Sequence, residues 1–216
     1  MRDRLLTAAA VAWLAAVVLI AIFGFGVGPD DVGSSPDTLV AGHVWRLLTS
    51  SLVVEDVLPY AQLLLLLLVS ALVLLRAGPL TWWLAAVLGH IGSALVAYAV
   101  MGVAVLLGSL SAEEATDNVD YGISCVFAAL LGALALGAAR RTRVRRAGGT
   151  PAPAPYASRR MDLVVLAGAA IAIFFFFVTI GWYGQEHLYA FAIGFAVAAW
   201  RAPARTTAPT RRRAAR

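Results

Sequence analysis

Two residues in apolar surroundings carry side chains that can break an amide bond when they act together. Ser124 follows Gly122 and Ile123 at the start of one apolar run, and His187 stands at the start of the last one. A serine hydroxyl becomes a nucleophile when a neutral histidine takes its proton. Free backbone N–H groups at the beginning of a helix, with the positive end of its dipole, favour a developing oxyanion. The sequence therefore suggests a dyad in which Ser124 is the nucleophile and His187 the general base.

The composition of the chain excludes most classes of protein that use such a dyad in water. Of its 216 residues, 61% are hydrophobic and 13% are charged, whereas a typical soluble domain has about 45–50% and about 25%. These values exclude an ordinary cytosolic enzyme and a disordered chain. The single cysteine, Cys125, excludes an intrachain disulfide. We therefore expect Ser124 and His187 to belong to a membrane protein.

Six apolar runs approach the length of about 20 residues that a helix needs to cross a bilayer. The sequence therefore predicts an all-α membrane protein, a bundle of six transmembrane helices over residues 1–200, followed by a flexible basic tail over residues 201–216. No Asp, Glu, Lys or Arg lies near the centre of any run. The runs are Leu5–Val27, Val57–Leu75, Leu80–Leu107, Tyr121–Ala139, Leu163–Ile180 and Gly181–Trp200.

The arginines predict how the chain is oriented. All 17 basic residues are arginines, and the net charge is +5. If the chain crosses the membrane six times, 16 of them lie on one side and only Arg46 lies on the other. The positive-inside rule then places both termini in the cytoplasm. We expect these arginines to contact anionic lipid headgroups, and we expect no nucleic acid as a partner.

This topology places Ser124 and His187 at similar depth near the outer face. The fourth run starts there at Tyr121, so that Ser124 is expected one turn, roughly 5 Å, into the helix. Asp120 is expected to cap that helix. His90, near mid-membrane, is expected to hydrogen-bond a neighbouring span. The histidines have no metal-ligand spacing, and we therefore predict no metal.

Three segments together resemble motifs of the rhomboid intramembrane serine proteases. The segment His43–Leu52 contains Trp45 and Arg46 and is similar to the Trp-Arg motif of the rhomboid first loop. The segment Gly122–Leu134 resembles the nucleophile segment, and His187–Gly194 resembles the last-span motif of a histidine followed by small residues. The resemblance implies a multi-pass protein of the bacterial inner (plasma) membrane that cleaves single-span membrane proteins near the outer face, without a cofactor.

The chain also departs from the rhomboid pattern. Cys125 stands where a glycine follows the nucleophile, Ala128 where an aromatic ring stacks on the histidine, and Ala190 where the last motif has a glycine. In the second span, rhomboids have a histidine and, four residues later, an asparagine that hold the oxyanion. Here Gln62 is the oxyanion candidate, and no histidine precedes it.

Other interpretations of these residues stay open. Ser124, Ala128 and Gly132 also fit a small-residue stripe for close helix contact, and Gln62 also fits an amide that bonds between helices. Phe174–Phe177 are expected to face lipid or, by the resemblance, to border a lateral substrate gate. Two functions compete with the protease: an inactive rhomboid-fold protein that binds membrane clients, and a small transporter, which the expected lack of buried carboxylates and of a broken-helix pair disfavours.

Overall fold

The structure is a computed structural model, which describes residues 1–24, 28–54, 59–111, 114–115, 119–151, 153–154, 157–178 and 182–201. Apart from Arg201, the expected basic tail lies outside the described residues. The part of the chain that is described is helical, and its only β-type pairing is a single antiparallel bridge between Ser34 and Asp120.

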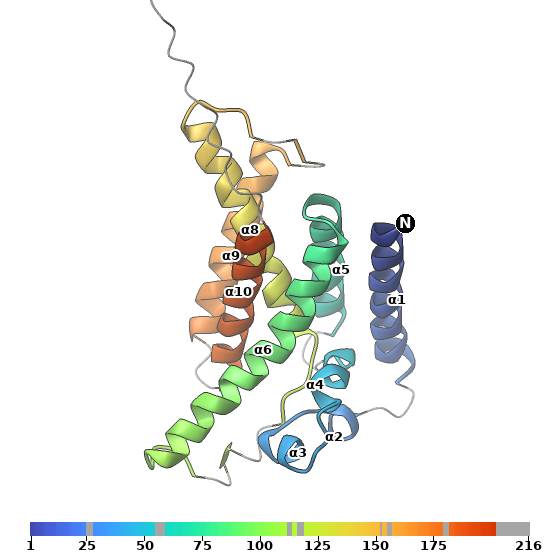
Figure 1. The fold of residues 1–216 in the computed structure, drawn as a ribbon, viewed down its shortest axis with the longest axis vertical. Coiled ribbons are helices and arrows are strands. Elements are labelled where there is room, and N and C mark those ends of the chain that lie inside the picture. Colours follow the sequence, from blue (N-terminus) through green and yellow to red (C-terminus); the bar gives the residue numbers. More distant parts are fainter. Residues whose placement is uncertain are drawn as a thin grey trace, which may run out of the picture.

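Six long helices cover the six predicted apolar runs (Figure 1). Four of them are long and apolar enough to cross a membrane, which supports a membrane protein: α1 (Arg2–Phe23), α5 (Pro59–Arg76), α6 (Pro79–Leu106) and α8 (Ser124–Arg146). The other two are α9 (Arg159–Val178) and α10 (Trp182–Arg201). Proline stands in the first turn of α6, where its missing N–H costs no hydrogen bond.

One predicted helix start is wrong, and another agrees. The fourth run was expected to be helical from Tyr121, but α8 begins only at Ser124. Gly122 has φ of +119°, a conformation that other residues rarely adopt and that interrupts a helix. The sixth run was expected to begin at Gly181, and α10 begins at Trp182. Ser124 is therefore the first residue of its helix, and His187 lies in the second turn of its own.

Three short helices and one 3-10 turn fill the long connection between α1 and α5. They are α2 (Pro29–Val32), α3 (Pro36–Val40), α4 (Arg46–Thr49) and η1 (Ser50–Leu52). In α3 the Ser35 side chain accepts from the Thr38 N–H while the Thr38 hydroxyl accepts from the Ser35 N–H, which is a complete capping box. These elements gather at the end of the bundle opposite to the N-terminus (Figure 1).

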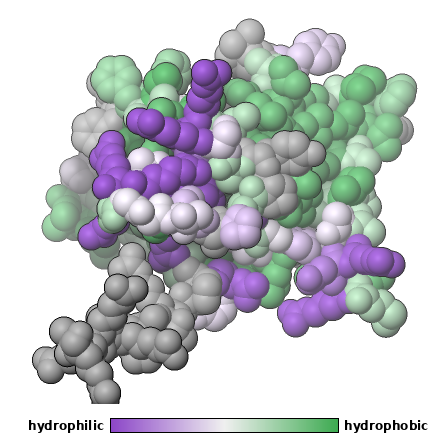
Figure 2. All heavy atoms as spheres, turned by 90° about the horizontal axis from the view of Figure 1, so that it is seen from above, coloured by the Kyte–Doolittle hydropathy of each residue, from purple (hydrophilic) through white to green (hydrophobic). Residues whose placement is uncertain are grey.

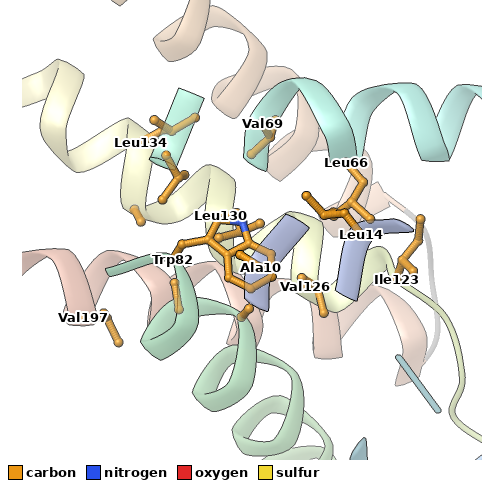
Figure 3. Close-up of a cluster of buried hydrophobic side chains, with 14 of the residues drawn as sticks. Ala10, Leu14, Leu66, Val69, Trp82, Ile123, Val126, Leu130, Leu134 and Val197 are labelled. Atoms are coloured by element: carbon orange, nitrogen blue, oxygen red, sulfur yellow. The ribbon is translucent and has the colours of Figure 1, made fainter. Parts of the chain in front are cut away.

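The helices α6, α8 and α10 pack against one another most extensively, with α9 and α5 against α8 and α1 against α6. In α8, 67% of the apolar stretch is buried, compared with 17% in α1, which makes α8 the central helix. Its buried side chains join those of α1, α5 and α6 in one cluster around Trp82 and Leu130 (Figure 3). This cluster holds the start of α8 against α5, because it includes Leu66, Ile123 and Val126.

The ends of several helices bring arginines together around one buried acid. Asp162, which is fully buried, accepts hydrogen bonds from Arg141 and Arg145 and lies 3.8 Å from Arg76. Burial raises the pKa of Asp162, but the hydrogen bonds and charges of Arg141 and Arg145 outweigh it and leave this pKa below its usual range. Figure 2 looks onto this end of the bundle and shows hydrophilic side chains gathered on it. Exposed arginines surround the cluster, namely Arg140, Arg143, Arg146, Arg159 and Arg160.

Candidate functional site

Ser124 is held at the N-terminus of α8 by the backbone before it. The Gly122 N–H donates to the Ser50 carbonyl at 2.8 Å, and the buried Ile123 is the residue that precedes the helix. The Ser124 side chain is half-buried. The first N–H groups of a helix have no carbonyl partner within that helix. A substrate oxygen near the Ser124 hydroxyl would therefore meet backbone donors and the positive end of the α8 dipole.

Glycines and alanines bring α8 and α10 unusually close. A methyl group added to Gly194 of α10 would overlap the Ala129 carbonyl oxygen of α8, and one added to Gly132 would overlap the Phe191 carbonyl oxygen of α10. Gly89 of α6 is equally close to the Ala129 side chain. Gly132 of the small-residue stripe predicted for α8 thus lies in a real contact surface. This surface holds the second and third turns of α8 against the third and fourth turns of α10.

His187 lies next to a buried carboxyl group that reaches both α6 and α8. Glu186 has 4% of its surface exposed, and the Ser93 hydroxyl of α6 donates to its Oε1 at 3.4 Å. The Cys125 side chain of α8 lies close to both Ser93 and Glu186. Because Cys125 follows Ser124 and Glu186 precedes His187, the backbone segments that carry the two predicted dyad residues are neighbours.

Asp120 does not have the predicted role of a helix cap. Among the described residues, no side chain caps α8. Asp120 instead exchanges two backbone hydrogen bonds with Ser34, of 2.7 and 2.8 Å, and its buried side chain lies close to Glu186. The Tyr98 hydroxyl of α6 pairs with the Ser34 hydroxyl at 2.9 Å and belongs to the same group of polar side chains.

Sequence reasoning missed this carboxyl pair. Glu186 lies near the start of the sixth predicted run, where no role was assigned to it, and α10 buries its side chain. The argument that a transporter is disfavoured by the absence of buried carboxylates was therefore wrong. One feature of the sequence could have indicated that Glu186 is buried. Glu186 and Ala190 are four residues apart, so that they share one face of a helix that starts before Glu186.

The site lies part-way along α6 rather than at its end. Cys125 is level with Ser93, and α6 continues from there to Leu106, roughly 20 Å further. This continuation is visible in Figure 1, where α6 runs well past the start of α8. Ser124 is thus recessed from the end of the bundle that holds α2, α3 and α4.

The other predicted site residues lie around this end of the bundle. Gln62 is half-buried in the first turn of α5, one turn before Leu66, which shares the apolar cluster of Ile123. Trp45 is 55% exposed and stacks against His43, with 4.8 Å between ring centroids. The Arg46 guanidinium donates to the Gly33 carbonyl at 3.3 Å, so that it fastens α4 to the segment before α3.

His90 has the internal hydrogen-bonding role that the sequence predicts, with one difference. His90 is buried and its Nε2 pairs with the Ser50 hydroxyl at 2.9 Å, so that its partner is the η1 segment and not a neighbouring span. Cys125 packs with Ala128, Ala129 and Ala190 in a cluster of small buried residues. Phe174 and Phe175 are exposed on α9, while the side chains of the two following phenylalanines lie outside the described residues. Within the described residues, no group of His, Cys, Asp and Glu is arranged to hold a metal ion.

Comparison with known proteins leaves the family open. No protein-family model matches the chain, and neither a curated protein nor a solved structure matches it.

Proposed function

We propose that this protein is a rhomboid-like intramembrane serine endopeptidase, with Ser124 as the nucleophile and His187 as the general base. The observation that supports it most is that Cys125 and Glu186, the immediate neighbours of these two residues, lie close together. The close glycine-mediated packing of α8 on α10 supports it further, since a dyad needs two backbones held in a fixed relation.

In the proposed reaction, the Ser124 Oγ attacks the carbonyl carbon of the scissile peptide bond while His187 takes the hydroxyl proton. The oxyanion that forms is held by backbone N–H groups of the first turn of α8, with Gln62 as a further candidate donor. The C–N bond then breaks, and His187 gives the proton to the leaving amine. Water, deprotonated by His187, attacks the acyl-serine ester and releases the acid and the free serine.

The proposed substrates are single-span membrane proteins that enter between helices from the bilayer. The exposed Phe174 and Phe175 on α9 are candidates for the border of that lateral path. In this proposal the protein lies in the bacterial inner membrane, crosses it six times and has both termini in the cytoplasm. The exposed arginines around Asp162 then face anionic lipid headgroups of the cytoplasmic leaflet.

Labelling with a fluorophosphonate probe tests the dyad directly. The purified full chain should be labelled at Ser124, and both Ser124→Ala and His187→Ala should lose labelling. Ser109→Ala is the matched control, because Ser109 is an exposed serine beyond the end of α6 and should leave labelling unchanged. Labelling that persists in either dyad variant would exclude this assignment.

The second candidate function is an inactive rhomboid-fold protein that binds membrane clients. Ala128 favours it, because this residue is fully buried among Cys125, Ala129 and Ala190, where rhomboids place an aromatic ring. This function predicts no labelling of the wild type, together with client crosslinks that survive Ser124→Ala. Since buried carboxyl groups are present, transport also needs a direct test, and solute flux into proteoliposomes would favour it over both.

A further inference from the structure

The group formed by Asp162 and the three arginines beside it carries more positive than negative charge. Arg141 and Arg145 donate to the Oδ1 and Oδ2 of Asp162 at 2.7 and 2.6 Å, and the Arg76 guanidinium lies 3.8 Å from the Oδ1. With three guanidinium groups and one carboxylate, these four side chains, which we call the arginine cluster, have a net charge of +2. The cluster is largely buried, because the side chains of Arg76, Arg141 and Arg145 are only 2%, 14% and 24% exposed.

The segments next to these helix ends contain no acid that could balance this charge. Residues 77–78 follow α5, residues 147–158 connect α8 to α9, and residues 202–216 follow α10, and none of them is Asp or Glu. In the proposed topology Asp3 lies on the same side, but it stands in the first turn of α1 between two arginines of its own. Charge that is removed from water without an opposite charge is costly. The excess charge of the cluster therefore favours an anion from outside the chain.

The cluster lies where the apolar stretches of three helices end. Arg76 is the last residue of α5, and Asp162 precedes Leu163, the first residue of the apolar run in α9. In α8 the apolar run ends at Ala139, and the helix continues to Arg146, roughly 10 Å further. The headgroup layer on each side of a bilayer is about 5–8 Å thick. In the proposed membrane arrangement, the cluster is therefore level with the phosphate groups of the lipids.

One further arginine extends the cluster towards this layer. Arg159 stands three residues before Asp162 on α9, so that the two share one face of the helix, and its side chain is exposed. Arg145 reaches the same segment, since its Nη2 donates to the Ala157 carbonyl at 2.9 Å. An anion in the headgroup layer can therefore contact Arg145 and Arg159, while the more deeply buried arginines of the cluster supply positive charge behind them.

The chemistry of the cluster favours phosphate groups as the anion. A guanidinium group binds phosphate oxygens through two parallel N–H donors, which makes arginine common where phosphate is recognised. We propose that the arginine cluster, together with Arg159, binds the headgroup of a phospholipid that carries two phosphate groups, such as cardiolipin. Two phosphodiesters carry one negative charge each and match the net charge of +2, whereas a headgroup with one phosphate balances half of it.

This inference rests on the proposed membrane arrangement but not on the dyad. Arg141 and Ser124 are 17 residues apart on α8, roughly 25 Å along the helix axis. A failure of lipid binding therefore leaves the fluorophosphonate labelling of Ser124 unaffected, and a failure of labelling leaves lipid binding unaffected.

Native mass spectrometry tests the proposal on the full chain, purified in a neutral detergent, by measuring the dissociation constant of each one-to-one lipid adduct. The lipids are cardiolipin, phosphatidylglycerol, which has one phosphate, and phosphatidylcholine, whose phosphate is balanced by its own choline. We expect cardiolipin to bind at least about tenfold more tightly than phosphatidylglycerol, which is the effect of a second charged contact, and phosphatidylcholine to bind most weakly. Equal binding of cardiolipin and phosphatidylglycerol would overturn the proposal. Displacement of cardiolipin by inorganic phosphate, but not by sodium chloride of the same ionic strength, would assign the site to free phosphate and overturn the lipid as its ligand.

Matched pairs of arginines separate this site from a general attraction between the basic end of the bundle and an anionic lipid. Arg145→Gln should weaken cardiolipin binding at least about tenfold, whereas Arg143→Gln, which changes an exposed residue on the opposite face of α8, should change it less than about twofold. On α9, Arg159→Gln should weaken binding about fivefold, the effect of one arginine near an anionic headgroup, and Arg160→Gln should leave it unchanged. If Arg145→Gln fails to fold, the exposed pair on α9 still decides. Equal losses in the two members of either pair would overturn the proposal.

Discussion

Replacing Gly194 by alanine tests whether the α8–α10 contact supports the whole bundle. The added methyl group would overlap the Ala129 carbonyl oxygen and lie 2.8 Å from the Ala129 Cα. Carbon atoms pack about 3.5–4.0 Å apart, so that the second contact alone is short by about 0.7 Å. Both obstacles are backbone atoms, which cannot rotate away as a side chain does. Helix α10 must therefore shift away from α8.

The size of the effect follows from two opposing contributions. Alanine is better than glycine in a helix interior by about 0.5–1 kcal/mol. Overpacking of a close-packed interior costs about 1–3 kcal/mol, and a clash with backbone belongs at the upper end. We expect Gly194→Ala to lower the free energy of unfolding by about 2 kcal/mol. A shift of about 1 Å between Ser124 and His187 should also slow fluorophosphonate labelling by tenfold or more.

The matched control is Gly168→Ala in α9, where an added methyl group meets no atom within 4 Å. This variant should be as stable as the wild type or slightly more stable, and its labelling should be unchanged. Stability is measured by thermal unfolding of the purified protein in micelles, followed by circular dichroism. A Gly194→Ala protein that unfolds at or above the temperature of Gly168→Ala would refute the packing argument, whatever the outcome of the labelling.

Two further changes test the buried polar contacts. Asp162→Ala removes the acid beside the buried Arg76 and should lower the free energy of unfolding, measured by chemical denaturation, by about 3 kcal/mol. The control Asp37→Ala changes an exposed acid and should lower it by less than about 0.5 kcal/mol. A loss of stability in Asp162→Ala no larger than in this control would contradict the role of the cluster. The pKa of Asp162 is lower in the folded than in the unfolded protein, where it is about 4, so that its ionised carboxylate contributes its full stabilisation above that pH. This contribution is lost as the pH falls below about 4. The difference in free energy of unfolding between the wild type and Asp162→Asn should therefore become smaller in that acidic range. Ser50→Ala leaves the His90 Nε2 without a partner and should cost about 1–3 kcal/mol, and an unchanged melting temperature would argue against that hydrogen bond.

The long helices were predictable because their signal is local. A run of about 20 apolar residues is stable in a bilayer only as a helix with its backbone hydrogen bonds satisfied internally. The six predicted runs coincide with the six long helices of the described residues to within four residues at each end, except that α8 continues past its run to Arg146. The alternation of arginine-rich and arginine-poor connections predicts one basic side, and this topology stays a prediction. Three of the arginines assigned to that side, Arg76, Arg141 and Arg145, lie together around Asp162.

The polar interior was decided by the tertiary structure. Nothing in the sequence near Glu186 indicates that its carboxyl group meets Ser93 and Asp120, because these residues are 93 and 66 positions away and meet only when α6, α8 and α10 pack together. The same holds for Ser50 and His90, whose bond depends on how the α4–η1 segment enters the bundle. The sequence by itself determined which segments are helices and which small residues allow close contact. Which polar groups face one another depends on the rotation and depth of each helix, and packing sets both.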